Sequence, residues 1–92
     1  MSDNNSLPQV HPNVSLREEY DDWALLFNPD TGDTVGLTPT GVTIWKSLTE
    51  GKDMSGIMSA LSQEFEDLPD NPEKDILVFF DEIVTLGFAK KI

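Results

Sequence analysis

Residues 23–51 read WALLFNPDTGDTVGLTPTGVTIWKSLTEG, and this stretch decides the fold. The dense apolar run over residues 23–27 is typical of a buried strand. Residues 28–33 are rich in side chains that fix or tolerate turn dihedrals, and residues 34–37 follow them as a further short strand. Upstream, apolar and polar side chains alternate over residues 14–20. We therefore expect three consecutive antiparallel strands.

A helix is expected directly after these strands. Thr38 can cap the free backbone N–H groups of the first turn, and Pro39 suits the first helical position because it loses no hydrogen bond there. The helix should run to about Glu50, and Gly51 is placed to end it in a left-handed conformation. Trp45 lies on the apolar face of this helix, so we expect its ring to anchor the core.

Two more helices are expected in the C-terminal half of the chain. Asp53 can cap the first of them, whose apolar side chains recur at helical spacing. Residues 66–72 read as an acidic, proline-containing loop, and Asn71 before Pro72 repeats the cap-and-proline pattern of a last helix that ends at Gly87. The order of the elements predicts an α+β fold, in which a three-stranded antiparallel sheet is followed by three helices in a winged-helix-like arrangement.

The chain has 92 residues, which suits one small domain. Residues 1–12 carry only Leu7 and Val10 as sizeable apolar groups, and this is too little burial to offset the entropy of ordering the segment. We predict that residues 1–12 form a disordered N-terminal tail and that residues 13–92 form the folded domain.

The charge balance limits the partners of the protein. Six Lys and Arg residues stand against 17 Asp and Glu residues, which gives a formal net charge of -11. Such an acidic chain repels phosphate backbones and anionic lipid. The N-terminus lacks the pattern of a secretion signal, and the longest apolar run, residues 76–80, is far too short to cross a bilayer. We expect a cytoplasmic protein with no nucleic-acid or membrane partner.

Residues that could carry out catalysis are scarce. The only histidine, His11, lies in the expected tail, and the serines at positions 55, 59 and 62 have no histidine in a folded element to activate them. The chain has no cysteine, and its glycines form no phosphate-binding loop. The sequence predicts that the protein is not an enzyme and that it has no catalytic residue and no cofactor.

Acidic side chains could in principle offer oxygen ligands to calcium. Asp30 and Asp33 lie in one turn, and Asp67, Asp70 and Glu73 lie near the acidic loop. A calcium loop needs ligands spread over about twelve residues, whereas a strand-like segment follows Asp33 at once. We interpret these carboxylates as turn formers and solvated loop residues rather than as a metal site.

The last helix has an unusually wide apolar arc. At about 100° per residue, one stripe is centred on Ile76, Phe80, Ile83 and Leu86. Phe79 lies at one edge of this stripe, and Leu77 and Val84 lie at the other. Two interpretations remain open: the strands and the first helix cover the whole arc, or part of it lines an apolar groove that accepts a peptide.

Several stretches occur here in a recognisable order. They are LFNPDTG at residues 26–32, LTPTG at residues 37–41, Ile44 with Trp45, and FFDEIVTLGF at residues 79–88. This set resembles the PqqD family of small peptide-binding domains, also called RiPP recognition elements. The family commonly has Asn at the position of Thr38; both residues can cap a helix, so the fold is not affected.

The resemblance implies a non-catalytic protein that binds the leader segment of a ribosomally made precursor peptide. It presents this peptide to a modifying enzyme, which is a radical SAM enzyme in the founding pathway of pyrroloquinoline quinone (PQQ) biosynthesis. The peptide is expected to add as a strand beside residues 34–37, in the cleft against the last helix. We place the opposite wall of that cleft on the side of the last helix that carries Leu77, Val78, Asp81 and Val84, and this choice rests on helix geometry alone. The expected peptide-binding residues are Thr34, Val35, Gly36, Leu37, Leu77, Val78, Asp81 and Val84.

A winged-helix DNA-binding regulator is the alternative, since three helices and a hairpin can suit a major groove. The charge of the last helix, which would be the recognition helix, argues against DNA binding. That helix offers Asp75, Asp81 and Glu82 against Lys74, and this balance repels phosphates rather than neutralising them.

Overall fold

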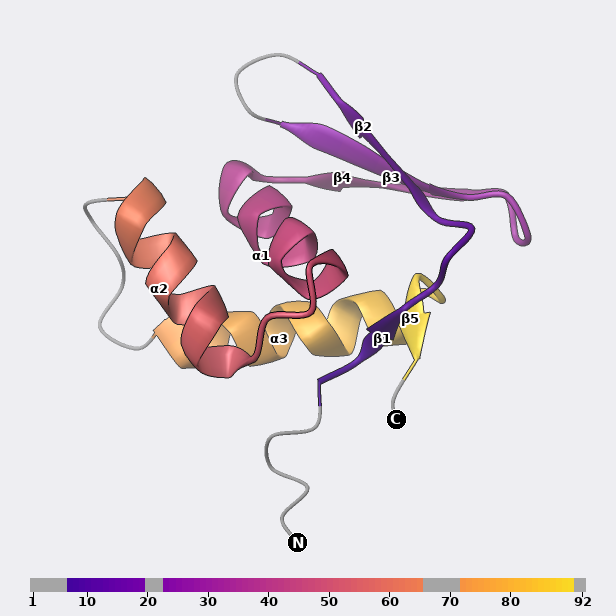
Figure 1. Ribbon diagram of the computed structural model, residues 1–92. Coiled ribbons are helices and arrows are strands. Elements are labelled where there is room, and N and C mark those ends of the chain that lie inside the picture. Colours follow the sequence, from indigo (N-terminus) through magenta and orange to yellow (C-terminus); the bar gives the residue numbers. More distant parts are fainter. Residues whose placement is uncertain (1–6, 20–22, 66–71, 91–92) are drawn as a thin grey trace, which may run out of the picture.

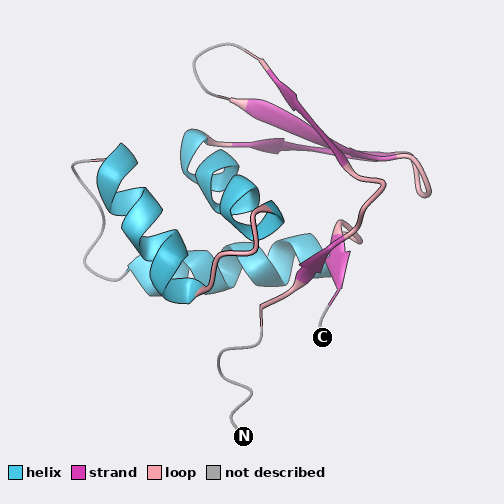
Figure 2. Cartoon of the chain, viewed as in Figure 1, coloured by secondary structure: helices cyan, strands magenta, loops and turns pink. Residues whose placement is uncertain are grey.

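The computed structural model describes residues 7–19, 23–65 and 72–90, and Figure 1 shows how their helices and strands are arranged. The predicted α+β fold is confirmed: a three-stranded antiparallel sheet precedes three helices. Figure 2 shows the three helices gathered on one side of this sheet. The elements are β1 (Gln9–Val10), β2 (Ser15–Glu18), β3 (Ala24–Asn28), β4 (Asp33–Leu37), α1 (Pro39–Thr49), α2 (Met54–Glu64), α3 (Pro72–Thr85) and β5 (Ala89–Lys90).

The sheet has the strand order β2-β3-β4, so β3 is central and β4 is an edge strand. Side chains of β3 alternate between the two faces of the sheet. Ala24, Leu26 and Asn28 are buried toward the helices, whereas Leu25 and Phe27 are exposed on the outer face. Because the side chains on both faces of β3 are largely apolar, the packing of the helices decides which face is buried.

The predicted caps of the first two helices are confirmed. The Thr38 hydroxyl accepts a hydrogen bond from the Gly41 N–H at 3.2 Å, and Pro39 occupies the first turn of α1. The Asp53 carboxylate accepts one from the Gly56 N–H at 2.8 Å. Each cap satisfies a backbone donor that has no partner inside its own helix, and so each fixes where the helix begins.

Two helices end as expected at a left-handed glycine. Gly51 has a φ of 82° after α1, and Gly87 has a φ of 90° after α3. At Gly87 the Phe88 N–H donates to the Ile83 carbonyl at 2.8 Å and the Gly87 N–H donates to the Val84 carbonyl at 3.2 Å. This pair of hydrogen bonds is a Schellman motif, and it turns the chain so that Phe88 is buried in the core.

The core consists of two adjoining clusters. One lies between the sheet, α1 and the C-terminal end of α3; the predicted anchor Trp45 is buried in it. The other lies among the three helices and contains Ile44, Ile57, Leu61, Ile76 and Phe80. Because both clusters use α1 and α3, these two helices are held firmly relative to each other and to the sheet.

The structure corrects the expectation of a disordered tail for residues 7–12. Gln9 and Val10 form β1, which pairs antiparallel with β5 near the C-terminus. Leu7 and Val10 each pack against a core cluster, and the His11 N–H donates to the Phe88 carbonyl at 3.1 Å. The segment itself has few apolar groups, but the far end of the chain offers them a surface to pack against, and this burial offsets the entropy of ordering the segment. Residues 1–6 lie outside the described residues.

In the described ranges, no helix is long and apolar enough to span a membrane. Within the same ranges, no group of three or more His, Asp or Glu side chains is placed to hold a metal ion.

Candidate functional site

The open edge of the sheet lies on β4. This strand pairs with β3 along one side, with Leu26 opposite Val35 and Ala24 opposite Leu37. Nothing in the described part of the chain pairs with its other side. An edge strand presents unpaired backbone N–H and C=O groups, so β4 can accept a further strand.

A shallow groove runs between this edge and α3. It has a volume of about 120 Å³ and is mainly apolar, with the exposed carboxylate of Glu82 on its α3 side. The residues that line it are Val35, Gly36, Leu37, Thr38, Gly41, Phe79, Glu82, Ile83 and Leu86. An unpaired strand edge beside an apolar groove provides the two requirements of peptide binding by strand addition, which are main-chain partners and a place for side chains.

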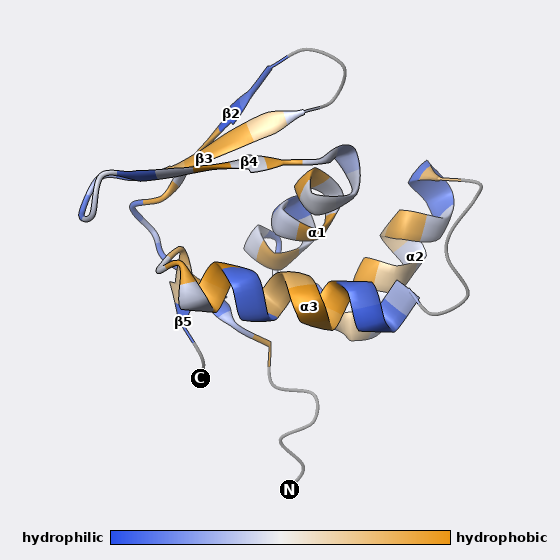
Figure 3. Cartoon of the chain, turned by 180° about the vertical axis from the view of Figure 1, so that it is seen from behind, coloured by the Kyte–Doolittle hydropathy of each residue, from blue (hydrophilic) through white to orange (hydrophobic). Residues whose placement is uncertain are grey.

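The α3 side of the groove has a buried part and an exposed rim. Ile83 is buried and Phe79 is half-buried, so both form its floor. Leu86 and Glu82 are exposed and form its rim. Figure 3 shows hydrophobic and hydrophilic bands alternating along α3. Leu77, Val78 and Leu86 are exposed, so the helix has apolar groups at its surface as well as in the core.

The predicted peptide-binding residues on the sheet fall in two places. Val35, Gly36 and Leu37 line the groove. Thr34 is exposed and stands opposite the exposed Phe27 in the register of the sheet. Its side chain therefore belongs to the outer face, although its backbone is part of the same edge.

The predicted residues on α3 lie away from this groove. Leu77, Val78 and Asp81 are exposed but do not line it, and Val84 packs against the core cluster beneath the sheet. The structure brings the Phe79 edge of the apolar arc to the groove, not the edge with Leu77 and Val84. Helical periodicity gives the angles between these side chains, but the direction in which the whole arc points depends on how α3 packs against α1 and the sheet.

Glu82 and Leu86 were not among the residues predicted for the site. Glu82 lies three residues and Leu86 seven residues after Phe79, so both share the Phe79 side of α3. A groove wall placed on the Phe79 edge of the apolar arc includes them. One signal in the sequence could have favoured that edge. Gly41 gives an aromatic side chain room to approach α1, and a Cβ atom added there would lie 3.3 Å from Cε1 of Phe79.

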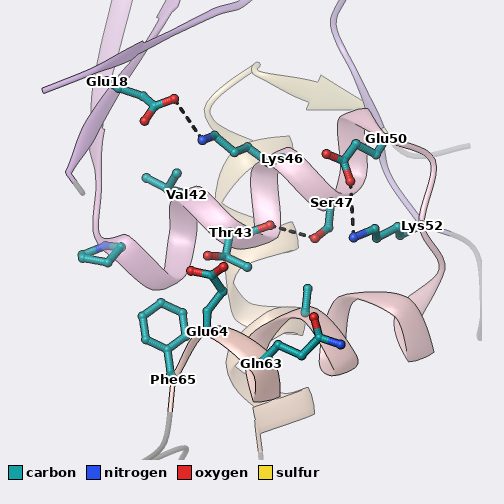
Figure 4. Close-up of a pocket in the computed structure, with 12 residues that line it drawn as sticks. Glu18, Val42, Thr43, Lys46, Ser47, Glu50, Lys52, Gln63, Glu64 and Phe65 are labelled. Carbon is teal, nitrogen blue, oxygen red and sulfur yellow. Dashed lines mark hydrogen bonds and ion pairs between the residues drawn. The ribbon is translucent and has the colours of Figure 1, made fainter.

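A larger cavity of about 320 Å³ lies between α1 and α2, but its chemistry does not suggest a ligand. Figure 4 shows its two lysines engaged with carboxylates: Lys46 contacts Glu18 at 2.9 Å and Lys52 contacts Glu50 at 3.3 Å. The Ser47 hydroxyl donates to the Thr43 carbonyl at 2.8 Å. Since these polar groups already satisfy one another, we do not assign a site to this cavity.

The outer face of the sheet carries a second apolar surface. Leu25 and Phe27 are exposed on the face of β3 that points away from the helices, and Trp23, which directly precedes the strand, is exposed as well. Gly36 of β4 lies beside Leu25 in the register, so little side-chain bulk shields the row on that side. This surface is on the opposite face from the groove and is distinct from it.

The comparisons with known proteins agree with this geometry. The family model described as "Coenzyme PQQ synthesis protein D (PqqD)" matches residues 24–89, a segment that includes β4, α3 and the whole groove. A solved structure, "TbiB1 in Complex with the TbiA(beta) Leader Peptide", is similar with a TM-score of 0.74 and 26% identity, over 88% of this chain and 93% of that chain. A search of curated proteins found no match. Because the family model covers well over half of the sequence, this chain belongs to the PqqD family.

Proposed function

We propose that this protein is a non-catalytic adaptor that binds the leader segment of a ribosomally made precursor peptide and presents it to a modifying enzyme, of the radical SAM type or another. The observation that carries this proposal is the open edge of β4 beside the apolar groove against α3. A similar solved structure is a complex with a leader peptide, and this supports the same use of the fold.

Strand addition explains how such a site can bind a peptide. Hydrogen bonds from the β4 backbone supply affinity that does not depend on sequence. Every second side chain of the added strand would face α3 and lie over Phe79 and Ile83, and these side chains supply specificity. The protein needs no reactive group for this role, because the chemistry belongs to the enzyme that receives the peptide.

DNA binding by the same fold is not supported. The described part of α3 carries Glu73, Asp75, Asp81 and Glu82 against Lys74, and the chain has a net charge of -11. Neutralising phosphates and releasing their counterions drives most protein affinity for DNA, and this surface cannot do so. A mobility-shift assay at physiological salt should show no retention of duplex DNA.

The test of the adaptor function is titration calorimetry of the full chain with the precursor peptide encoded beside its gene. Binding should be followed by single N-methylation of successive leader amides. Methylation of amides that face β4 should abolish binding, and methylation of the alternate amides should not, because only every second N–H of an added strand points to its neighbour. If methylation of both alternating sets of amides abolishes binding, strand addition is rejected. If the unmodified precursor peptide does not bind, the proposed function is rejected.

A further inference from the structure

The groove between β4 and α3 combines an apolar floor with one carboxylate. Of the residues that line it, Glu82 alone has an ionisable side chain. Glu82 is exposed at the rim, next to the floor formed by Phe79 and Ile83. A peptide side chain that crosses the floor would therefore meet a negative charge at the helix side of the groove.

Glu82 is available for a partner. The ion pairs in the described part of the chain join Arg17 to Glu19, Lys46 to Glu18 and Lys52 to Glu50, and Glu82 takes part in none of them. A carboxylate without a cation beside an apolar surface is suited to a long basic side chain, because Lys and Arg lay their alkyl stems on apolar groups and keep the charged end at the water boundary.

Negative potential is also expected at the end of the groove that lies near the C-terminus of α3. Asp33 is exposed at the start of β4, opposite Asn28, and Asn28 in turn donates to the Gly87 carbonyl at 2.8 Å, just past the end of α3. Asp33 therefore lies at the same end of the molecule as the C-terminus of α3. The C-terminus of a helix carries a partial negative charge, which also favours a cation nearby.

We propose that the groove selects leader peptides in which a Lys or Arg lies two positions from an apolar residue. This inference rests on the proposed function, because it assumes that the peptide is an extended strand beside β4. Residues two apart in a strand point the same way and are separated by roughly 6.8 Å. At a rise of about 1.5 Å per residue, Glu82 lies about 4.5 Å beyond Phe79 along α3, so an apolar side chain over Phe79 places the next inward-facing side chain within reach of Glu82.

The negative charge of the whole protein must be separated from the effect of Glu82. With a net charge of -11, the protein attracts any basic peptide at long range. Asp81→Lys is the matched control for Glu82→Lys, because both variants change the net charge equally and Asp81 does not line the groove. The two side chains lie about 100° apart around α3. Both are exposed, so each variant should fold, which circular dichroism will check.

The experiment uses a display library of random 14-residue peptides, selected on the full-length wild-type protein and on the two variants. Wild type and Asp81→Lys should enrich Lys or Arg two positions from Leu, Ile, Val or Phe. Glu82→Lys should enrich Asp or Glu at that position instead. Fluorescence anisotropy with the most enriched wild-type peptide should show about a tenfold higher Kd for Glu82→Lys and less than about a threefold change for Asp81→Lys at 0.15 M salt.

Four outcomes would overturn the inference. The same basic preference in all three proteins, or an equal loss of affinity in the two variants, would assign the selectivity to overall charge. Enriched peptides with an apolar pattern but no charged position would reject the role of Glu82 and leave the adaptor function intact. Failure of all three proteins to enrich any peptide would reject the adaptor function together with this inference.

Discussion

Gly41, in the first turn of α1, lies so close to Phe79 of α3 that a Cβ atom on the glycine would be 3.3 Å from Cε1 of the ring. Both residues line the groove beside β4. The absence of a side chain at Gly41 therefore determines where the Phe79 ring lies, and the ring in turn determines the shape of the groove floor.

We expect Gly41→Ala to weaken peptide binding more than it changes stability. The added methyl group should push the ring toward the groove and raise the Kd by about threefold, whereas the better helix propensity of alanine, about 1 kcal/mol, should offset the tighter contact in the free energy of unfolding. Calorimetry and urea denaturation measure the two effects. In a Phe79→Leu background the same substitution should cost little affinity; an equal cost in both backgrounds would show that the ring is not the cause.

Two leucines on α3 allow the wall of the groove to be tested directly. Leu86 is 46% exposed and lines the groove, while Leu77 is 49% exposed and does not. Leu86→Glu should raise the Kd for the precursor peptide by tenfold or more, on the order of the 1.5–3 kcal/mol that a large apolar side chain contributes when buried. Leu77→Glu, which makes the same change in charge and volume, should leave the Kd within about twofold. The reverse result would place the peptide on the Leu77 and Val84 edge.

Removal of the N-terminal strand should destabilise the protein. Deleting residues 1–10 eliminates the pairing of β1 with β5 and the packing of Leu7 and Val10. We expect a loss of about 2 kcal/mol and a decrease in Tm of roughly 10 °C, since 1 kcal/mol shifts the Tm of a domain of this size by about 4–8 °C. Deletion of residues 1–6 keeps β1 and is the control. If the longer deletion melts at the same temperature as the control, the β1 and β5 pairing does not contribute to stability.

The buried amide of Asn28 should be important for stability. Its Nδ2 donates to the Gly87 carbonyl at 2.8 Å, and its Oδ1 accepts from the Asp30 N–H at 2.9 Å. Asn28→Ala leaves both partners without this amide, so the free energy of unfolding should fall by about 1–3 kcal/mol in urea denaturation. Thr31→Ala, which removes an exposed hydroxyl contact to the Asp33 N–H in the same turn, should cost less than about 1 kcal/mol. A similar loss in the free energy of unfolding for both variants would mean that the hydrogen bond from Asn28 to Gly87 contributes no more to stability than an exposed contact.

The sequence by itself determined the local boundaries of this fold. Thr38 and Asp53 cap their helices through hydrogen bonds that span three residues, and Gly51 and Gly87 end helices through their own backbone conformation. Such features depend on neighbours along the chain, and so residue type and spacing suffice to predict them. The apolar run over residues 23–27 likewise predicted a strand, although it could not show which side chains of β3 would be buried, because both faces of the strand are apolar.

Only the tertiary structure decided what these elements bring together. The pairing of β1 with β5 joins the two ends of the described chain, and no local pattern indicates that partner. The rotation of α3 about its axis is fixed by contacts such as Asn28 with Gly87 and Gly41 with Phe79, which connect residues far apart in sequence. For that reason the sequence predicted the β4 edge of the groove, whereas the choice of Phe79, Glu82 and Leu86 as its opposite wall required the packed structure.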